Sequence, residues 1–337
     1  MKKMVNLFKI SLNRFFKISK PMGYPYMAHI DPASICNLSC YNCPVTNYEE
    51  KSNPYLSFEN FKKFIDGSGD YLLYIILWSW GEPLLNKDFC KMTAYAREKN
   101  ILTVTSTNLN RLSVKDAEAL VEHGPDALIV AMDGVTNETY SRLREGGDLN
   151  KVKENLQLLL KTRQEKEVST PFMNLRMVVS SENENEVEEF KKTGRDLHMD
   201  MVSIKAYSTR QSGILDKDID KHYSPRNESL RWYRYQDDFS PDKKAKKYDC
   251  KFPWTKPMLF ADGTIVSCEF DFDKTLPFGD INNQNFKEIW FGKTAKKFRQ
   301  KFQKNRDDVP FCKDCVYDYK VIPGCVLYRE FPEKKVI

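Results

Sequence analysis

The sequence predicts an α/β fold of six β/α units followed by a smaller C-terminal module. Between residues 25 and 207, short apolar and β-branched runs alternate with longer amphipathic segments, a pattern typical of parallel strands joined by helices. The chain then turns polar and irregular, and a second set of strand-like runs begins near residue 250. A length of 337 residues is sufficient for one large core and one smaller module.

The expected elements follow one another in strict alternation. The six expected strands are residues 26–35, 72–78, 101–106, 127–132, 172–179 and 201–205. The helices expected between them are residues 58–65, 87–99, 114–122, 149–162 and 184–197. Several of these helices follow Ser, Asp or Asn, the residues preferred at helix N-caps. We therefore expect four regions: a segment 1–25, a β/α region 26–207, a connector 208–249 with one helix, and a module 250–337.

Charge and cysteine content limit the possible functions. The net charge is +6, but beyond the N-terminus Lys and Arg are intermixed with Asp and Glu, and we find no nucleic-acid-binding motif. We therefore do not expect nucleic acid as a partner. Nine cysteines without a secretory signal indicate a reducing compartment, where thiols bind metals rather than form disulfides. This predicts a cytoplasmic protein.

The first 20 residues are basic and amphipathic. They contain no acidic residue, and their basic residues are Lys2, Lys3, Lys9, Arg14, Lys17 and Lys20. Apolar residues lie between these at helical spacing, but the segment is too short and too charged to span a bilayer. Two interpretations remain open: the helix lies on an anionic membrane surface or a partner, or it packs under the main domain.

A triplet of cysteines is the most informative motif. Cys36, Cys40 and Cys43 have the spacing Cys-x3-Cys-x2-Cys directly after the first expected strand. Iron-sulfur clusters usually have four thiolate ligands, so three thiolates predict a cluster whose fourth iron binds a substrate or cofactor. The alternative is a zinc site completed by a distant Cys or His.

This spacing resembles the signature of the radical S-adenosylmethionine (radical SAM) family, and the six β/α units fit that family's partial (β/α)6 barrel. The resemblance implies a 4Fe-4S cluster that binds S-adenosylmethionine. Further motifs at expected strand ends resemble the family's cofactor contacts. The residues that match are Gly81, Glu82, Pro83, Thr107, Asn108, Asp133 and Arg144. The alternative for Thr107, Asn108 and Asp133 is ordinary loop capping.

The chain departs from the family's pattern at three positions. Leu109 replaces a glycine, and Ala131 replaces a serine whose hydroxyl would contact the cofactor. Asn42 stands where an aromatic residue often packs against adenine, so we include it among the cofactor contacts without expecting stacking.

A second set of cysteines lies in the C-terminal module. Cys250 and Cys268 flank an expected hairpin, strands 254–260 and 264–268 around Gly263, and Cys312 and Cys315 form a Cys-x2-Cys pair. These four thiolates can form a closed site, either an iron-sulfur cluster or zinc. The arrangement resembles the twitch form of the SPASM domain, which implies one auxiliary 4Fe-4S cluster. The role of Cys325 stays open.

The resemblance implies an oxidoreductase. The S-adenosylmethionine bound at the first cluster would be cleaved to a 5′-deoxyadenosyl radical, which takes a hydrogen atom from the substrate, and the auxiliary cluster would accept an electron. Our leading interpretation is dehydrogenation of a sugar or cyclitol-like small molecule. The alternatives are peptide maturation, modification of a lipid-linked substrate, and a zinc-binding scaffold without activity. A flavodoxin- or ferredoxin-like protein is the expected reductant.

The sequence contains no motif that identifies a general base. Lys205 and Tyr207, at the end of the sixth strand, are candidates because side chains at the carboxyl ends of barrel strands reach the active-site face.

Overall fold

A computed structural model describes residues 1–16, 18–41, 43–47, 53–208, 217–313, 315–321 and 326–332. Asn42 and Cys325 lie outside the described residues. The chain forms two compact units, each assembled from segments distant in sequence. Unit 1 contains Met1–Ile35, Glu49–Thr105 and Tyr248–Cys315, and unit 2 contains Cys36–Tyr48, Ser106–Lys247 and Val316–Ile337.

The strands of unit 1 are centred on β1 (Met27–Ile30). On one side β1 pairs in parallel with β2 (Tyr74–Leu77), which pairs in parallel with β3 (Leu102–Thr107). On the other side β1 pairs in parallel with β7 (Met258–Leu259), which begins an antiparallel series with β8 (Thr264–Val266) and β9 (Gly279–Asp280). Residues from the N-terminal third and from the C-terminal module therefore share one set of strands.

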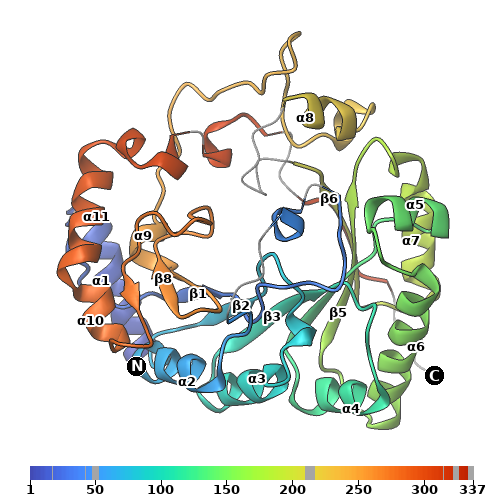
Figure 1. Cartoon of the computed structure of the whole chain (residues 1–337), viewed down its shortest axis with the longest axis horizontal. Helices are drawn as coiled ribbons and strands as arrows, with labels where there is room; N and C mark the ends of the chain where they lie inside the picture. The colour runs from blue at the N-terminus through green and yellow to red at the C-terminus, as the bar shows by residue number, and fades with distance from the viewer. Residues whose placement is uncertain are drawn as a thin grey trace. The chain divides into compact units, whose positions relative to one another are not determined.

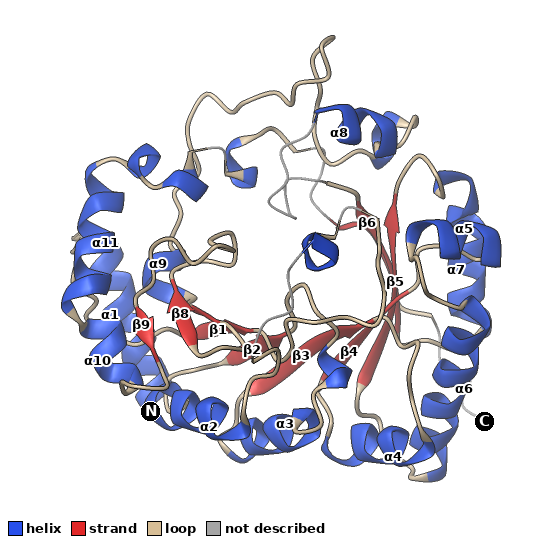
Figure 2. Cartoon of the chain, viewed as in Figure 1, coloured by secondary structure: helices blue, strands red, loops and turns tan. Residues whose placement is uncertain are grey.

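Unit 1 contains six α-helices within its described residues. They are α1 (Lys2–Phe15), α2 (Phe58–Ser68), α3 (Phe89–Glu98), α9 (Phe252–Thr255), α10 (Phe286–Phe291) and α11 (Lys293–Lys304). Figure 2 shows α2 and α3 on one side of β1–β3. Helices α2 and α10 meet closely, because a Cβ at Gly67 would lie 2.7 Å from the Cβ of Phe286, and Phe286 also stacks on the buried Trp290. Large aromatic side chains thus fill the core of this unit.

Unit 2 has three parallel strands, β4 (Ala127–Ala131), β5 (Phe172–Val179) and β6 (Met201–Ala206), with β10 (Val326–Glu330) antiparallel to β6. Its helices are α4 (Val114–His123), α5 (Asn137–Leu143), α6 (Leu149–Glu165), α7 (Val187–Asp196) and α8 (Lys217–Tyr223). The N-cap residues Ser113, Thr136 and Asp148 accept hydrogen bonds from first-turn N–H groups of α4, α5 and α6. These caps explain where the three helices begin.

Short 3-10 turns complete the described chain. They are η1 (Pro44–Asn47), η2 (Pro83–Leu85), η3 (Glu184–Glu186), η5 (Glu228–Leu230), η6 (Arg306–Asp308), η7 (Pro310–Cys312) and η8 (Val316–Asp318). Among the described helices, none is both long and apolar enough to cross a membrane.

The α/β fold with six strands in sequence order is confirmed, and two predicted strands need correction. The first ends at Ile30 rather than at residue 35, because the residues that follow form the irregular cysteine loop. The strand expected from residue 254 is reduced to Met258–Leu259, because Pro253 lies in the first turn of helix α9. Helix α5 and strand β10 were not predicted as elements, and β10 belongs to unit 2 rather than to the C-terminal module.

Candidate functional site

The three cysteines of the triplet lie together in one loop of unit 2. Cys36, Cys40 and Cys43 are half-buried, and the Cys43 N–H donates to the Cys40 carbonyl at 3.1 Å. This hydrogen bond holds the second and third cysteines in one tight turn. None of the eight cysteines within the described residues is in a disulfide, so their sulfur atoms can serve as metal ligands.

Two donors approach the sulfur atoms of this loop. The Asn108 amide donates to Cys36 Sγ at 3.6 Å and to Asn37 Oδ1 at 3.0 Å. Arg144 Nη1 lies 4.0 Å from Cys40 Sγ. Burial raises the pKa of the Cys40 thiol, and Arg144 opposes this shift. Both donors therefore favour a thiolate, which is the form that binds iron.

Arg144 is fixed by a buried ion pair with Asp133. The Arg144 Nη2 and Nε atoms lie 2.6 and 2.7 Å from Asp133 Oδ2, and the two side chains are 17% and 10% exposed. Asp133 Oδ1 accepts from the Val178 N–H at 2.7 Å. Burial opposes the charge on Arg144, but Asp133 and Cys40 raise its pKa well above the usual value. Arg144 is therefore a permanent cation between the Asp133 carboxylate and the cysteine loop.

The loop after β3 contains one of the positions that differ from the family's pattern. Leu109, which stands in place of a glycine, has a φ of +52° and is buried. Its N–H donates to Thr107 Oγ1 at 3.0 Å, and its carbonyl accepts from Asn155 Nδ2 at 2.8 Å. The backbone here thus keeps the left-handed conformation that glycine adopts most easily. Thr107 and Asn108 make loop hydrogen bonds, as the capping alternative predicts, and Asn108 also reaches the cysteine loop.

The Gly-Glu-Pro motif belongs to unit 1, where it follows β2. A Cβ at Gly81 would lie 1.9 Å from the Ala33 carbonyl oxygen and 2.6 Å from that of Ile35, so only glycine fits. The Glu82 N–H donates to the Ile35 carbonyl at 2.8 Å, and the buried Glu82 side chain accepts from the Leu84 N–H. The motif therefore lies directly against the chain that leads into the cysteine loop.

The C-terminal cysteines gather in unit 1. Burial raises the pKa of Cys250 to about 12, and the nearby Cys315 contributes to this shift. Burial also raises the pKa of Cys268, with a contribution from Cys250. The loop segments that carry Cys250 and Cys312 are joined by Arg306, which donates to the Tyr248 carbonyl at 2.6 Å and to the Cys312 carbonyl at 3.4 Å.

These donor sets fit iron-sulfur clusters. Three thiols in one loop and four in another region match the ligands that such clusters take. Within the residues that the structure describes, no three Cys, His, Asp or Glu side chains surround one ion-sized centre.

A buried ion pair that sequence reasoning missed lies beside the C-terminal cysteines. Lys256 Nζ is 2.6 Å from Glu269 Oε1, with side chains 7% and 16% exposed, and Glu269 Oε2 lies 3.5 Å from Cys268 Sγ. Although burial opposes both charges, Lys256 lowers the pKa of Glu269 to about 2. Burial lowers the pKa of the neighbouring His29 to about 4. The sequence signal was the acid that directly follows Cys268.

The two general-base candidates lie at the end of β6 in unit 2. Lys205 Nζ is 5.8 Å from the centre of the Trp232 ring, and the Tyr207 ring centre is 5.6 Å from that of Tyr223. Tyr223 also packs at 4.4 Å against Tyr41 of the cysteine loop. Tyr207 thus belongs to an aromatic cluster that reaches this loop, whereas Lys205 packs on a different ring.

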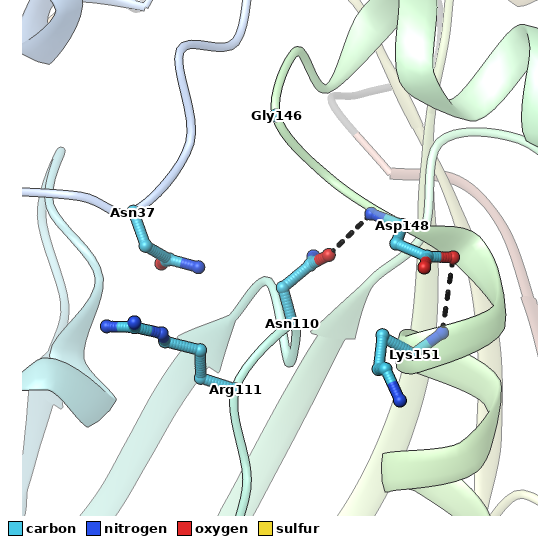
Figure 3. Close-up of a pocket in the computed structure, with 6 residues that line it drawn as sticks. All are labelled: Asn37, Asn110, Arg111, Gly146, Asp148 and Lys151. Atoms are coloured by element: carbon cyan, nitrogen blue, oxygen red, sulfur yellow. Dashed lines mark hydrogen bonds between the residues drawn. The ribbon is translucent and has the colours of Figure 1, made fainter.

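A pocket of about 490 Å³ adjoins the cysteine loop of unit 2 (Figure 3). It is lined by Asn37, Asn110, Arg111, Gly146, Asp148 and Lys151. Asn37 directly follows Cys36, and Asn110 Oδ1 accepts from the Asp148 N–H at 2.7 Å. The pocket therefore places polar side chains next to the first cysteine.

A family model described as "Radical SAM superfamily" matches residues 30–193. The chain belongs to the radical SAM superfamily. A second model, an iron-sulfur cluster-binding SPASM domain, matches residues 250–316. The predicted order of a radical SAM domain followed by a SPASM domain is confirmed, and so is the prediction of an enzyme. These domains imply a 4Fe-4S cluster with S-adenosylmethionine and auxiliary iron-sulfur binding.

Curated relatives match only part of this radical SAM enzyme. Fe-coproporphyrin III synthase of Methanosarcina barkeri is 34% identical over 34% of this chain and 29% of its own length. A probable GTP 3′,8-cyclase of Methanococcus maripaludis is 27% identical over 36% of this chain and 41% of its own length. The chain thus matches well under half of each of these relatives.

Solved structures share the fold over most of the chain. SuiB of Streptococcus suis, bound to S-adenosylmethionine, has a TM-score of 0.62 at 15% identity, covering 86% of this chain and 71% of SuiB. The anSMEcpe structure with bound AdoMet has a TM-score of 0.55 at 20% identity, covering 89% of both chains. BtrN in complex with AdoMet and 2-DOIA has a TM-score of 0.52 at 18% identity, covering 87% of this chain and 93% of BtrN.

Proposed function

We propose that this enzyme oxidises a hydroxyl-bearing small molecule, sugar-like or cyclitol-like, to a ketone. The observation that carries the proposal is the pairing of two thiol sets, Cys36, Cys40 and Cys43 in unit 2 and Cys250, Cys268, Cys312 and Cys315 in unit 1. A triplet with an open position suits radical generation, and a separate set of four suits electron acceptance.

When bound, the first cluster and S-adenosylmethionine would supply hydrogen-atom abstraction, with 5′-deoxyadenosine as the co-product, and the auxiliary cluster would supply an electron acceptor. In the proposed balance the substrate would lose one carbon-bound hydrogen atom, its hydroxyl proton to a base of this chain and one electron to that acceptor, leaving a carbonyl group. A flavodoxin- or ferredoxin-like protein is the proposed source of the electron that starts each cycle.

Residues of this chain would bind and orient these groups. Asn108 and Arg144, at 3.6 and 4.0 Å from two sulfur atoms, would stabilise the negative charge of the triplet thiolates. Arg144 would also attract the carboxylate of S-adenosylmethionine. Tyr207, whose ring lies in the aromatic cluster beside the cysteine loop, is the better-supported of the two base candidates.

The remaining cofactor contacts are proposed from the motifs. Gly81 would bring backbone carbonyls close to the amino group of S-adenosylmethionine, because the chain there tolerates no side chain. Glu82 and Pro83 would complete this contact, Thr107 would lie near the ribose, and Asn42 would lie near the adenine.

The similarity to BtrN supports a small-molecule substrate, since BtrN was solved with 2-DOIA and is covered over 93% of its length. A peptide substrate is the second candidate. It is supported by the higher TM-score of SuiB, which was also solved with the precursor peptide SuiA, and by anSMEcpe, solved with the Kp18Cys peptide. A lipid-linked substrate is the third candidate, because α1 carries an exposed apolar face. The scaffold interpretation is not retained for a radical SAM enzyme.

Metal content and S-adenosylmethionine cleavage test this proposal first. Anaerobically reconstituted enzyme should contain about eight irons, and a Cys36→Ala/Cys40→Ala/Cys43→Ala variant about four. With reductant and S-adenosylmethionine, chromatography should detect 5′-deoxyadenosine from the wild type alone. Cys90 is a half-buried cysteine of helix α3 outside both thiol sets, so a Cys90→Ala variant should keep the wild-type iron content and still form 5′-deoxyadenosine. Zinc in place of iron would contradict the proposal.

Deuterium transfer then tests the substrate class. A cyclitol or sugar deuterated at its carbinol carbons should pass one deuterium into 5′-deoxyadenosine and yield a ketone. Transfer only from a deuterated peptide would overturn the small-molecule assignment in favour of the second candidate.

A further inference from the structure

Helix α1 of unit 1, labelled in Figure 1, has an apolar face whose side chains are exposed to solvent. Its exposed apolar side chains follow one another mostly at helical intervals, which places them on one side of a helix. They are Met1 (102% exposed), Met4 (73%), Val5 (48%), Phe8 (65%), Phe15 (80%) and, just beyond the helix, Phe16 (61%). We call these six residues the apolar face of α1. A surface helix normally buries such a face against its own core.

The two side chains of α1 that the structure shows as buried are polar instead. Asn6 and Asn13, seven residues apart, are 2% and 4% exposed. Asn6 accepts from the Tyr24 N–H at 2.8 Å and donates to the Tyr24 carbonyl at 2.9 Å. Asn13 donates to the Ile18 and Lys20 carbonyls at 3.1 and 3.0 Å. Two asparagines thus anchor the inner side of the helix to the chain that follows it.

That following chain is itself held by two tryptophans of unit 1. Trp254 Nε1 donates to the Ile18 carbonyl at 3.1 Å, and Trp290 Nε1 donates to the Gly23 carbonyl at 3.0 Å. A Cβ at Gly23 would lie 2.6 Å from Asn6 Oδ1, so the chain and the helix are in close contact. Rotating α1 to bury its phenylalanines would break these hydrogen bonds and leave buried polar groups unpaired. The outward orientation of the apolar face is therefore built into the fold.

Positive charge lies along one edge of the apolar face. The first 20 residues contain six basic and no acidic residues. Lys9 and Lys20 are exposed, and Lys2 forms an ion pair with Asp70 at 2.6 Å between exposed side chains. At helical spacing Lys9 and Lys2 border the Phe16 and Val5 edge of the face. Apolar side chains beside an excess of cations are the composition of helices that lie in membrane interfaces.

We propose that α1 docks this enzyme on an anionic membrane surface. Phe8, Phe15 and Phe16 would enter the boundary between headgroups and acyl chains, and Lys9 and Lys20 would contact lipid phosphates. The charge pattern favours a membrane over a protein partner, because six basic and no acidic residues among the first 20 match an anionic surface. This inference does not depend on the substrate of the enzyme.

Vesicle co-sedimentation of the full-length, anaerobically prepared enzyme tests this docking. The wild type should bind vesicles containing phosphatidylglycerol, bind phosphatidylcholine vesicles much less, and lose binding as salt rises. In a Phe8→Ser/Phe15→Ser/Phe16→Ser variant, vesicle binding should weaken by roughly tenfold or by a larger factor, because exposed aromatic area drives insertion. Lys9→Gln and Lys20→Gln should each weaken binding roughly fivefold.

A matched control separates the apolar face from exposed apolar area in general. Val114→Ser/Phe331→Ser alters side chains that are 59% and 64% exposed in unit 2, and it should bind anionic vesicles as the wild type does. All substituted phenylalanines are more than half exposed, so the variants should keep the wild-type melting temperature. Equal vesicle binding by wild type and the triple variant would overturn the proposal. Concentration-dependent self-association that the triple variant abolishes, without vesicle binding, would also overturn it and indicate a protein interface.

Discussion

At the scale of single residues, buried charged side chains lie beside both thiol sites, and the cysteine motifs alone do not indicate them. In unit 2, Arg144 is paired with Asp133 and lies 4.0 Å from Cys40 Sγ. In unit 1, Glu269 is paired with Lys256 and lies 3.5 Å from Cys268 Sγ. Each thiol set therefore has one buried ion pair beside it, and in both cases one member of the pair reaches a sulfur atom.

The Lys256–Glu269 pair gives a residue-scale prediction. Lys256→Met removes the cation of the pair, and the buried Glu269 carboxylate then lacks the charge that stabilises it. The free energy of unfolding should therefore fall by about 3 kcal/mol or more. Lys256→Met/Glu269→Gln removes both charges and should lose less stability than the two single variants combined. Urea unfolding of samples with equal iron content, followed by tryptophan fluorescence, measures both effects.

The exposed pair Lys192–Asp196 provides the control. Both side chains are 60% exposed, so solvent screens the pair and Lys192→Met should leave the urea midpoint close to that of the wild type. If Lys256→Met proved as stable as Lys192→Met, burial of the Lys256–Glu269 pair would have no energetic consequence and its structural role would be excluded.

At the scale of elements, the hairpin β7–β8 determines where Cys268 lies. Gly263 at its turn has a φ of +96°, and a Cβ there would lie 2.4 Å from Asn282 Nδ2. Gly263→Ala should therefore strain the turn, displace Cys268, and lower the iron content from about eight toward four while 5′-deoxyadenosine formation remains detectable. Iron analysis after anaerobic reconstitution provides the measurement.

A second glycine with positive φ is the comparison for this variant. Gly146, at φ +83°, lies in unit 2 and has room for a methyl group, because the atoms nearest to an added Cβ would be 3.9 Å away. Gly146→Ala should keep the iron content of the auxiliary site, because it adds backbone strain without a clash near Cys268. Full iron content in Gly263→Ala would show that the hairpin does not position Cys268.

Elements with strong local signals could be predicted from the sequence, and those defined by distant contacts could not. β5 was predicted with its observed ends because its eight residues form one largely apolar run bounded by polar chain. Helix α5 was missed because it is only seven residues long and mostly polar. Its N-cap residue Thr136 alone was too weak a signal for a helix start. β10 was missed because its described pairing is with β6, more than 100 residues earlier.

The candidate sites divide in the same way. The cysteine spacings are local, so all seven proposed cluster ligands could be named from the sequence. Tertiary contacts, which the sequence does not show, bring Lys256 and Glu269 together and turn Asn6 and Asn13 inward. The amphipathic pattern of α1 was equally consistent with an apolar face packed against the protein and with one exposed to solvent. Leu109 departs from the family's glycine in sequence, yet it keeps the left-handed backbone conformation that glycine adopts most easily.

At the scale of the whole molecule, the two thiol sets belong to different compact units. The triplet lies in Cys36–Tyr48 of unit 2, a segment that interrupts unit 1 in the sequence, and the four C-terminal cysteines lie in Tyr248–Cys315 of unit 1. Metal binding contributes folding free energy to the segments that supply the ligands. Each cluster should therefore stabilise its own unit more than the other.

Hydrogen exchange measured by mass spectrometry tests this separation. Cys250→Ala/Cys268→Ala leaves two thiols, too few to hold the auxiliary cluster, so exchange should increase in residues 248–313 while the β5–β6 region of unit 2 stays protected. Cys36→Ala/Cys40→Ala/Cys43→Ala should instead increase exchange in residues 36–41 and 106–148, where Asn108 and Arg144 approach the sulfur atoms. Equal deprotection of both units by either variant would mean that the two units unfold together, and that cluster loss at one site destabilises the entire enzyme.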